Sequence, residues 1–490
     1  MTDSLRTGSQ TPSIPDRVQV LILGAGPGGY SCALRLAELG LDVLLVEPGR
    51  AGGTCLHAGC IPSKALIHAA DVFSANVRSS SSPEANAPQA NDPESALVKM
   101  GIACKEVTLD WHQTQAWKSE VVDNLARGVD GLLAAAGVKS IRGRGQMLDG
   151  KRVLVVPESG ADPVEVQAQQ VVLAVGSREV ILPSLPASDS VLYAADALAL
   201  ADLPEHLAVV GGGYIGLELG QAFARFGVKV SIVEAQDRLL PAYPKSLVAP
   251  LLKALARDDI QTHTGALAQS FSDGYLRIID QAKAGQEQVI RADKVLVAVG
   301  RQANLEGWGR EHLALDLADG FIAVDRRGET SMSGVFAVGD VTGEPMLAHR
   351  AIAQGKVVAE VIAGRRREFA PVAIPAVCFT APEILSVGLT AEEAKATGQG
   401  VLVKRFPLAA NGRSLTLGNP TGFVEVVADS TDHVLLGVQA VGEHVAELVH
   451  SFTLALEMGA RLEDVADTVH AHPTIGESFA EVSQAALGFK

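Results

Sequence analysis

The stretch VQVLILGAGPGGY, residues 18–30, decides the fold class of this chain. A run of β-branched residues and leucine leads directly into glycines spaced G-x-G-x-x-G, and the helical pattern SCALRLAELG follows at 31–40. The next apolar run, VLLVEPG at 43–49, contains Glu47. A strand, a glycine turn, a helix and a strand in this order, with an acidic residue at the end, predict a dinucleotide-binding unit.

Each motif glycine has its own physical reason. Gly24 permits the tight turn, Gly26 lets the backbone approach a pyrophosphate, and Gly29 allows the helix to lie close to the strand. The N-terminus of that helix then presents unpaired N–H groups and its positive dipole end to the phosphates. Glu47 stands where a carboxylate would accept hydrogen bonds from an adenosine ribose.

The same arrangement recurs at 208–234, AVVGGGYIGLELGQAFARFGVKVSIVE, with Gly211, Gly213 and Gly216 as its glycines. In both units the acidic residue follows the first motif glycine by 23 positions; in the second unit it is Glu234. A carboxylate there would repel a 2′-phosphate, and Arg238 is the single arginine nearby. The second unit is therefore predicted to prefer NAD over NADP.

Three apolar runs end alike, VVLAVGS at 171–177, VLVAVGR at 295–301 and VFAVGD at 335–340. After Pro371 the pattern changes to short alternating runs, such as GFVEVVAD and HVLLGVQAVG, followed by the helical patterns AELVHSFTLALEMG and LEDVADTV. We predict an α/β fold with two Rossmann-like units on parallel sheets and a C-terminal α+β domain.

The segment SSSSPEANAPQANDPE, residues 79–94, is predicted to be a mobile surface insertion.

Composition narrows the class of protein. The 490 residues are 47% hydrophobic and 20% charged, which predicts a globular chain of about two to four domains. The formal net charge of −15 argues against binding to nucleic acid, because a polyanion would be repelled. No apolar run is long enough to span a bilayer, and MTDSLRTGSQTPSIPDR lacks the apolar core of a secretory signal. A cytoplasmic protein that binds neither nucleic acid nor membrane is expected.

The stretch GGTCLHAGCIPSK, residues 52–64, holds two of the five cysteines. Cys55 and Cys60 could be a metal clip completed by His57 and His68, a structural disulfide or a redox pair. The metal interpretation lacks a second cysteine pair, so no metal site is expected. A structural disulfide is unusual in a reducing compartment. The redox interpretation is favoured.

The residues that follow the pair support reactive sulfur. Pro62 suits the first turn of a helix, and SKALIHAADVF continues with helical periodicity. Cys60 would then lie near a helix N-terminus, where the dipole stabilises a thiolate. Lys64, one turn further on, adds positive charge.

The segment HAHPTIGE, residues 470–477, supplies a base that the cysteines lack. Only a thiolate attacks a disulfide, and a histidine at hydrogen-bond distance removes the thiol proton. A carboxylate on the other ring nitrogen fixes the tautomer and stabilises the imidazolium. We predict these roles for His472 and Glu477, whereas His470 is equally well explained as a structural residue.

At this point GGTCLHAGCIPSK resembles the active-site signature of the class I pyridine nucleotide–disulfide oxidoreductases. The resemblance extends from about residue 17 to 488 through GAGPGG, GGGYIGLELG, VFAVGD, MLAHRA and HAHPTIGE. It is strongest to members that reoxidise protein-bound dihydrolipoamide with NAD+ in 2-oxoacid dehydrogenase or glycine cleavage complexes. In several segments the amino-acid sequence is most similar to that of bacterial members attached to branched-chain 2-oxoacid complexes. His57-Ala58 and Val175 depart from the commonest pattern, which has Asn-Val and Thr there.

The resemblance implies a domain order and residue roles. The implied domains are a lead-in at 1–16, an FAD-binding domain at 17–185, an NAD-binding domain at 186–305, a central domain at 306–370 and a dimerisation domain at 371–490. The implied catalytic residues are Cys55, Cys60, His472 and Glu477. The implied FAD-binding residues are Gly24, Gly26, Gly29, Glu47, Gly53, Thr54, Lys64, Gly145, Gly176, Ser177, Asp340, Met346, Leu347, Ala348 and His349. The implied NAD-binding residues are Gly211, Gly213, Tyr214, Ile215, Gly216, Glu218, Glu234, Ala266 and Gly300.

It also implies how these residues act together. Lys64 would lie by flavin N5, paired with Glu218, and Asp340 would hold the ribityl chain. FAD would be held tightly and NAD would exchange. His472 would reach the disulfide of the other subunit, so a homodimer is implied. The other implied partners are the lipoyl domain and the peripheral-subunit-binding domain of an acyltransferase.

Other members of the same family fit less well. Glu234 disfavours the NADP-dependent enzymes of the glutathione reductase kind, and QAALGFK at the chain end lacks the extra cysteine pair of mercuric reductases. Soluble transhydrogenases usually lack the first cysteine of the pair, whereas Cys55 is present. The complete set of reactive residues also disfavours a non-catalytic flavoprotein.

Overall fold

The computed structural model describes residues 14–80, 100–102, 104–281 and 285–489. The chain divides into two compact units, Met1–Pro62, Ser119–Glu179 and Arg301–Ala370 in one, and Ser63–Lys118, Val180–Gly300 and Pro371–Lys490 in the other. Most of the predicted lead-in at 1–16 and of the predicted insertion at 79–94 lies outside the described residues. The predicted domain limits stay a prediction.

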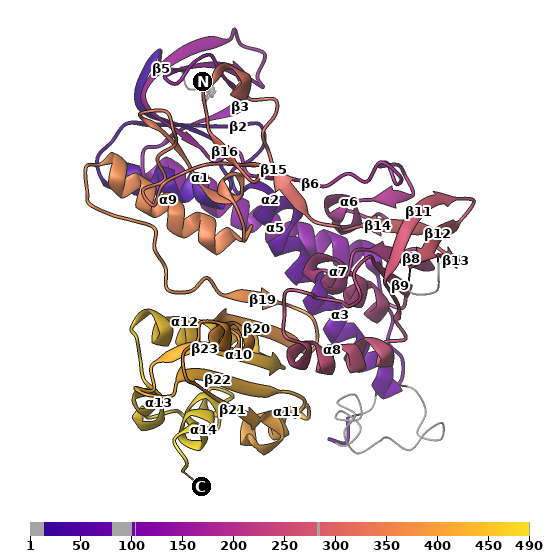
Figure 1. Ribbon diagram of the computed structural model, residues 1–490. Coiled ribbons are helices and arrows are strands. Elements are labelled where there is room, and N and C mark those ends of the chain that lie inside the picture. The colour runs from indigo at the N-terminus through magenta and orange to yellow at the C-terminus, as the bar shows by residue number, and fades with distance from the viewer. Residues whose placement is uncertain (1–13, 81–99, 103, 282–284, 490) are drawn as a thin grey trace, which may run out of the picture. The chain divides into compact units, whose positions relative to one another are not determined.

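A twisted sheet forms the centre of the first unit (Figure 1). Its strands run in the order β1 (Arg17–Leu23), β2 (Val43–Glu47), β3 (Lys139–Met147), β4 (Arg152–Pro157), β5 (Val164–Leu173) and β18 (Val335–Ala337), with β1 also paired to β5. The pairs β1–β2, β2–β3, β1–β5 and β5–β18 are parallel, and β4 is antiparallel to both of its neighbours. The glycine turn follows β1, at the carboxyl end of this parallel core.

Strand β1 is buried on both faces, as its continuous apolar run predicts. Val20 and Ile22 enter one hydrophobic cluster, whereas Leu21 and Leu23 enter another on the opposite face. Helices α1 (Pro27–Glu38) and α9 (Ala348–Ile362) lie side by side over the first of these faces (Figure 1). The core thus fixes the helix whose N-terminus follows the glycine turn.

Smaller elements complete this unit. They include α2 (Gly53–Ala58), the antiparallel pair β6 (Ser177–Glu179) and β15 (Arg301–Ala303), the pair β16 (Leu317–Ala318) and β17 (Phe321–Ile322), and the 3-10 turns η2 (Arg310–His312) and η3 (Gly339–Thr342). Helices α3 (Cys60–Ser80) and α5 (Trp111–Ala135) contribute residues to both units.

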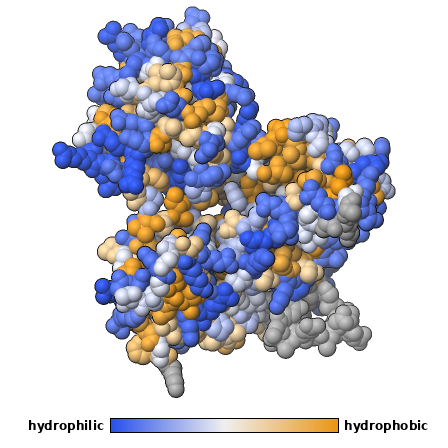
Figure 2. All heavy atoms as spheres, viewed as in Figure 1, coloured by the Kyte–Doolittle hydropathy of each residue, from blue (hydrophilic) through white to orange (hydrophobic). Residues whose placement is uncertain are grey.

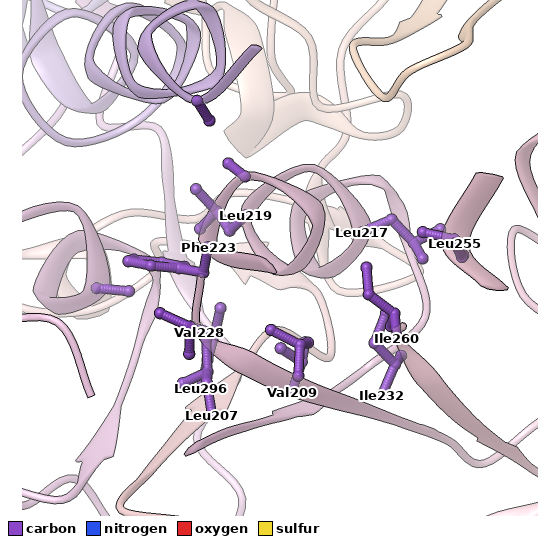
Figure 3. Close-up of a cluster of buried hydrophobic side chains, with 14 of the residues drawn as sticks. Leu207, Val209, Leu217, Leu219, Phe223, Val228, Ile232, Leu255, Ile260 and Leu296 are labelled. Atoms are coloured by element: carbon purple, nitrogen blue, oxygen red, sulfur yellow. The ribbon is translucent and has the colours of Figure 1, made fainter. Parts of the chain in front are cut away.

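The second unit contains a parallel sheet in the order β10 (Gln261–Thr264), β9 (Lys229–Glu234), β8 (His206–Val210), β14 (Lys294–Val297) and β7 (Val191–Leu192). Helices α6 (Ala194–Leu198), α7 (Tyr214–Arg225) and α8 (Lys245–Arg257) accompany it. Figure 3 shows Leu217 and Phe223 of α7 above Val209 of β8 and Ile232 of β9, which join one buried cluster. Burial of this helix face fixes α7 and the second glycine turn on the sheet.

Two antiparallel sheets follow in the same unit. One is formed by β11 (Ala266–Ser272), β12 (Tyr275–Asp280) and β13 (Gln286–Arg291). The other has the order β19 (Ala376–Cys378), β20 (Glu383–Gly388), β23 (Leu435–Gly442), β22 (Phe423–Asp429) and β21 (Val401–Pro407). Around it lie α10 (Ala391–Ala396), η4 (Leu408–Ala410), α11 (Gly412–Leu417), η5 (Val445–Leu448), α12 (Val449–Glu457), α13 (Leu462–Asp467) and α14 (Glu477–Ala486).

The predicted fold class is confirmed. Both glycine motifs join a buried parallel strand to a helix, and the residues after 371 form an antiparallel sheet with helices. The three runs with similar endings overlap the ends of β5 and β14 and the whole of β18, and these strands belong to the two sheets that carry the glycine turns. Among the helices of the described residues, none has the length and apolar character to cross a membrane.

Candidate active site

Cys55 and Cys60 form a disulfide, with their Cα atoms 4.7 Å apart. Cys55 lies in α2, and Cys60 is the first residue of α3. The predicted helix start at the second cysteine is therefore confirmed. His57, which the metal interpretation would recruit, has Nε2 at 2.9 Å from the carbonyl oxygen of Ala51.

Helix α2 begins against the first glycine turn. The N–H of Gly52 donates to the carbonyl oxygen of Ala25 at 2.8 Å. A Cβ on Gly53 would lie 2.6 Å from the Cα of Gly26, and its φ of +59° also favours glycine. Two motifs that are separate in the sequence thus meet, and the disulfide is held beside the turn by this close approach.

The first glycine turn fits a bound pyrophosphate. Gly24 has a φ of +99°, and a Cβ there would collide with the carbonyl oxygen of Ala174. A Cβ on Gly29 would collide with the carbonyl oxygen of Gly24. At Gly26, by contrast, the nearest heavy atom to a Cβ would be 4.0 Å away. The outer glycines satisfy the protein's own packing, whereas the middle one leaves space for a ligand.

Two further groups line this half of the site. The carboxylate of Glu47 accepts from the Ala25 N–H at 2.7 Å and from the Gly49 N–H at 3.1 Å, which aims it at the turn. The Ser177 hydroxyl donates to Asp340 Oδ2 at 2.6 Å. Both carboxylates are fixed in place while each oxygen retains a lone pair that a ribose or ribityl hydroxyl could use.

The second glycine turn repeats this geometry. A Cβ would collide with a carbonyl oxygen at Gly211 and at Gly216, but it would meet nothing within 4 Å at Gly213. Glu234, which is 9% exposed, accepts from the Gly212 N–H at 2.6 Å and from the Gln236 N–H at 2.8 Å. A second dinucleotide therefore fits here by the same physical argument.

The guanidinium of Arg238 is not available to bind a 2′-phosphate at the second glycine turn. Its guanidinium donates to the carbonyl oxygen of Tyr243 at 2.9 Å and also to that of Pro241. These bonds hold it in the loop after β9. The carboxylate of Glu234 therefore determines the local charge, which matches the NAD preference predicted from the sequence.

Lys64 and Glu218 form an ion pair, with Nζ and Oε2 2.7 Å apart. Lys64 lies in α3, one turn after Cys60, and Glu218 lies in α7, where it is 4% exposed. The backbone N–H of Phe379 donates to the other carboxylate oxygen at 2.8 Å, and the Phe379 ring centroid is 4.5 Å from Nζ. This buried carboxylate is thus satisfied by a cation and a backbone donor.

His472 and Glu477 also form a pair, with Nδ1 and Oε1 2.7 Å apart. The second carboxylate oxygen accepts from the Thr474 N–H at 2.7 Å. That N–H, and then His472, hold the pKa of Glu477 below its ordinary value. The His472 side chain is 78% exposed, so its imidazole ring is accessible from outside while Glu477 holds its orientation. His470 Nε2 lies 3.2 Å from the Val465 carbonyl oxygen, consistent with a structural residue.

The remaining predicted residues lie in several environments. Gly145 in β3 leaves no room for a Cβ, which would collide with Leu23, so packing alone explains this glycine. Ala266 is 2% exposed within a hydrophobic cluster. Gly176 and Gly300 have positive φ and open space around a Cβ. Thr54 is in α2, Tyr214 and Ile215 begin α7, and Met346, Leu347, Ala348 and His349 stand at the start of α9.

Sequence reasoning missed several polar supports. Arg301 donates to the Ser177 hydroxyl at 2.8 Å and to the Ser177 carbonyl oxygen at 2.8 Å, behind Asp340. Gln354 accepts from the Gly339 N–H at 2.9 Å, and Arg350 donates to the Gly343 carbonyl oxygen at 2.8 Å. Both lie on α9 and hold the turn that carries Asp340. The sequence signal was a cluster of polar residues within the apolar helix AHRAIAQGKVVAEVI.

The fold and these sites define the class of protein. The model for the pyridine nucleotide–disulphide oxidoreductase family matches residues 18–355, and the model for the dimerisation domain of that family matches residues 374–483. The chain belongs to the pyridine nucleotide–disulphide oxidoreductase family.

Curated relatives and solved structures agree with this membership. The chain is 48% identical to the dihydrolipoyl dehydrogenase of Pseudomonas aeruginosa, over 96% of this chain and 98% of that protein. It is 40% identical to the dihydrolipoyl dehydrogenase of Geobacillus stearothermophilus, over 96% of each chain. The LpdA structure from Mycobacterium tuberculosis superposes with a TM-score of 0.85 at 25% identity, over 96% of this chain and 99% of that one. The flavoprotein disulfide reductase RclA of Escherichia coli shares the fold, with a TM-score of 0.82 at 23% identity over 96% of this chain and 100% of that one.

Proposed function

We propose that this protein is a dihydrolipoyl dehydrogenase, which oxidises the dihydrolipoyl group of an acyltransferase and reduces NAD+. The observation that carries the proposal is the Cys55–Cys60 disulfide held against the first glycine turn, in a chain with a second, NAD-type turn. Relatives that are 38–48% identical over nearly the whole chain carry this name.

The sulfur chemistry is a thiol–disulfide exchange between the dithiol of the substrate and the Cys55–Cys60 disulfide. His472 removes the proton of one substrate thiol, and the thiolate attacks Cys55. The second substrate thiol then attacks the substrate sulfur of the mixed disulfide, which forms oxidised lipoamide and breaks the bond to Cys55. Cys55 leaves as a thiol that carries this second proton, while His472 keeps the first. The substrate loses two electrons and its two thiol protons, while the Cys55–Cys60 bond gains the two electrons. Cys60 is left as a thiolate, stabilised by its place at the N-terminus of α3.

The first glycine turn would hold FAD. Gly26 leaves space for the pyrophosphate, Glu47 would bind the adenosine ribose, and Ser177 with Asp340 would bind the ribityl chain. Lys64 would place its ammonium beside the flavin, paired with Glu218. When bound, FAD supplies a two-electron carrier between the cysteines and the nicotinamide.

The second glycine turn would hold NAD. Gly213 leaves space for the pyrophosphate, and Glu234 would accept hydrogen bonds from both ribose hydroxyls. Tyr214 begins α7 beside this turn and is 37% exposed. Its ring has two roles that fit equally well, covering the nicotinamide position until the cofactor enters or packing beside the turn.

A second copy of the chain would complete the site. Figure 2 shows hydrophobic side chains on the surface of the region formed by residues 371–490, in the lower left of the view. Leu454, Met458 and Val469 in this region are 62%, 75% and 96% exposed. An exposed apolar surface of this kind favours association with another protein surface. In the homodimer, His472 of one subunit would serve the disulfide of the other.

The larger assembly follows from the substrate. Dihydrolipoyl groups are carried on the lipoyl domain of an acyltransferase, and its peripheral-subunit-binding domain would hold this enzyme. The complex would be a 2-oxoacid dehydrogenase, with a branched-chain 2-oxoacid as the favoured class, or the glycine cleavage system. The assembly would be cytoplasmic.

The test is a set of single substitutions in the purified yellow enzyme. We expect Cys55→Ser to abolish oxidation of free dihydrolipoamide by NAD+. Reduction of the parent enzyme by two electrons should produce a long-wavelength thiolate–flavin band, which Cys60→Ser should remove. For His472→Gln we expect at least about a 100-fold loss of turnover with flavin still bound. Normal dihydrolipoamide turnover in Cys55→Ser would refute the proposal.

A further inference from the structure

The Lys64–Glu218 pair has a third member that the reaction scheme does not use. Phe379 follows β19 and is half-buried. Its backbone N–H donates to Glu218 Oε1 at 2.8 Å, while its ring centroid lies 4.5 Å from Lys64 Nζ. One residue therefore contacts both ends of the pair, through two different chemical groups.

The backbone around Phe379 is fixed to α7 at two points. Besides the bond to Glu218, the Ala381 N–H donates to Gln221 Oε1 at 2.8 Å, and Gln221 Nε2 donates to the Ala381 carbonyl oxygen at 2.9 Å. Glu218 and Gln221 are three positions apart and so share one face of the helix. The ring is thus held by a backbone that has little freedom to follow Lys64.

The ring constrains the cation more than Glu218 alone can. A lysine has a long, flexible stem, and Lys64 keeps 33% of its side chain exposed. An ammonium over an aromatic face is attracted to the ring, and the attraction increases as water is excluded. The carboxylate attracts Nζ from one side. The Phe379 ring occupies a second side, so the ammonium has fewer positions available to it. Burial raises the pKa of the neighbouring Cys378 to about 12, so its thiol adds no charge that would compete.

We propose that Phe379 is a positioning residue for the reaction, whose ring holds the Lys64 ammonium in the place from which it acts on the flavin. The inference rests on the proposed function, because that function puts Lys64 beside the flavin. The backbone N–H serves Glu218 whichever side chain stands at 379. The role of the ring can therefore be separated from that of the backbone.

Phe379→Leu removes the ring and keeps the N–H. We expect the flavin midpoint potential to become more negative, because the reduced, anionic flavin loses a well-placed cation. The thiolate–flavin band formed on two-electron reduction should weaken. Turnover of dihydrolipoamide should fall about 5- to 20-fold, with its KM changed less than about two-fold. Phe379→Tyr keeps an aromatic face and should retain the parent potential and band.

A matched control lies in the same sheet. The Arg405 guanidinium stands 4.5 Å from the centroid of the Phe423 ring, a second cation–π contact on β22, which is three strands along the sheet from β19. Phe423→Leu removes an equal ring and should leave potential, band and turnover unchanged. If Phe379→Leu does not fold, Phe379→Met removes the ring with nearly the same volume.

The outcomes are distinct. An unchanged potential and band in Phe379→Leu or Phe379→Met would overturn the inference, and so would an equal shift in Phe423→Leu. The potential and band are measured by dithionite titration of the flavoenzyme, without dihydrolipoamide. A parent enzyme with no dihydrolipoamide activity would therefore refute the proposed function, while the effect of the ring is still measured.

Discussion

Glu477 Oε1 lies 2.7 Å from His472 Nδ1, so the carboxylate fixes which ring nitrogen acts as the base. An ionised carboxylate accepts a hydrogen bond from the Nδ1–H group, which keeps the proton on Nδ1 and leaves Nε2 as the basic nitrogen. Glu477 is itself fixed, because its other oxygen accepts from the Thr474 N–H at 2.7 Å. The pair is thus arranged within this chain before any substrate arrives.

We expect Glu477→Gln to slow dihydrolipoamide oxidation about 10- to 100-fold, part of the larger factor that a general base contributes. The amide can donate to Nδ1 and so stabilise the wrong tautomer, and it no longer stabilises the imidazolium. Stopped-flow reduction of the enzyme by dihydrolipoamide measures this step directly. Glu463→Gln is the matched control, since Glu463 Oε1 lies 2.5 Å from His433 Nδ1 in the same domain. Equal losses in the two variants would contradict the role of Glu477.

Nucleotide choice should depend on Glu234 and not on Arg238. We expect Glu234→Ala to lower kcat/KM for NAD+ about 10- to 100-fold, the value of hydrogen bonds to a charged group. NADP+ should not become a good substrate, because Arg238 stays bound to the Tyr243 carbonyl oxygen at 2.9 Å. Steady-state kinetics with both nucleotides tests this. Efficient use of NADP+ by Glu234→Ala would show that Arg238 is free to move.

The sequence predicts the parts of the fold and the site that are local. The glycine turns, the two cysteines and the His472–Glu477 pair each lie within a few positions, where turn geometry and helix ends determine the structure. A buried strand and an amphipathic helix are likewise recognisable from their own periodicity.

The supporting contacts are not local, and the sequence does not reveal them. Arg301 meets Ser177 across 124 positions, and the Phe379 N–H meets Glu218 across 161. The chain has many other arginines and phenylalanines, and nothing in the residue type or the neighbouring sequence distinguishes Arg301 and Phe379 from them. Only the packing of the strands and helices selects these two, because side-chain chemistry alone does not specify a distant partner.

Stability should depend on the carboxylate of Glu360, which joins α9 to α1 in the first unit. Its Oε1 lies 2.6 Å from Arg35 Nη2, and its Oε2 lies 2.9 Å from Arg367 Nε. The hydrogen bond from Arg35 is the main cause that lowers the pKa of Glu360. We expect Glu360→Gln to reduce the free energy of unfolding by up to about 1 kcal/mol at pH 7, the usual range for such pairs.

The pH dependence of this effect has a definite sign. Because the folded-state pKa of Glu360 is depressed, its stabilisation is complete above the ordinary glutamate pKa of about 4.3 and is lost as pH falls through the lowered value. The difference between Glu360→Gln and the parent should be constant from about pH 5 to 8 and shrink below. Glu38→Gln, at the exposed partner 2.9 Å from Arg35, should have a smaller effect. Denaturant unfolding at several pH values measures all three proteins.

The two glycine turns allow the cofactors to be assigned independently. Gly26 and Gly213 have φ values of −66° and −78°, which any residue adopts. The nearest atom to a Cβ on Gly26 is 4.0 Å away, and none lies within 4 Å at Gly213. Alanine at either position should therefore fold normally, and its methyl group should occupy only the space of a pyrophosphate.

We expect Gly26→Ala to purify with little flavin, and Gly213→Ala to keep its flavin but show a raised KM for NAD+. Flavin absorbance of the purified dimer and steady-state kinetics distinguish the two. Each variant is the control for the other, because the substitution and the local backbone are the same. Flavin loss in Gly213→Ala with retention in Gly26→Ala would reverse the assignment. A full complement of flavin and an unchanged KM for NAD+ in both variants would mean that neither turn contacts a phosphate. If a turn did contact a phosphate, the added methyl group would have to displace it.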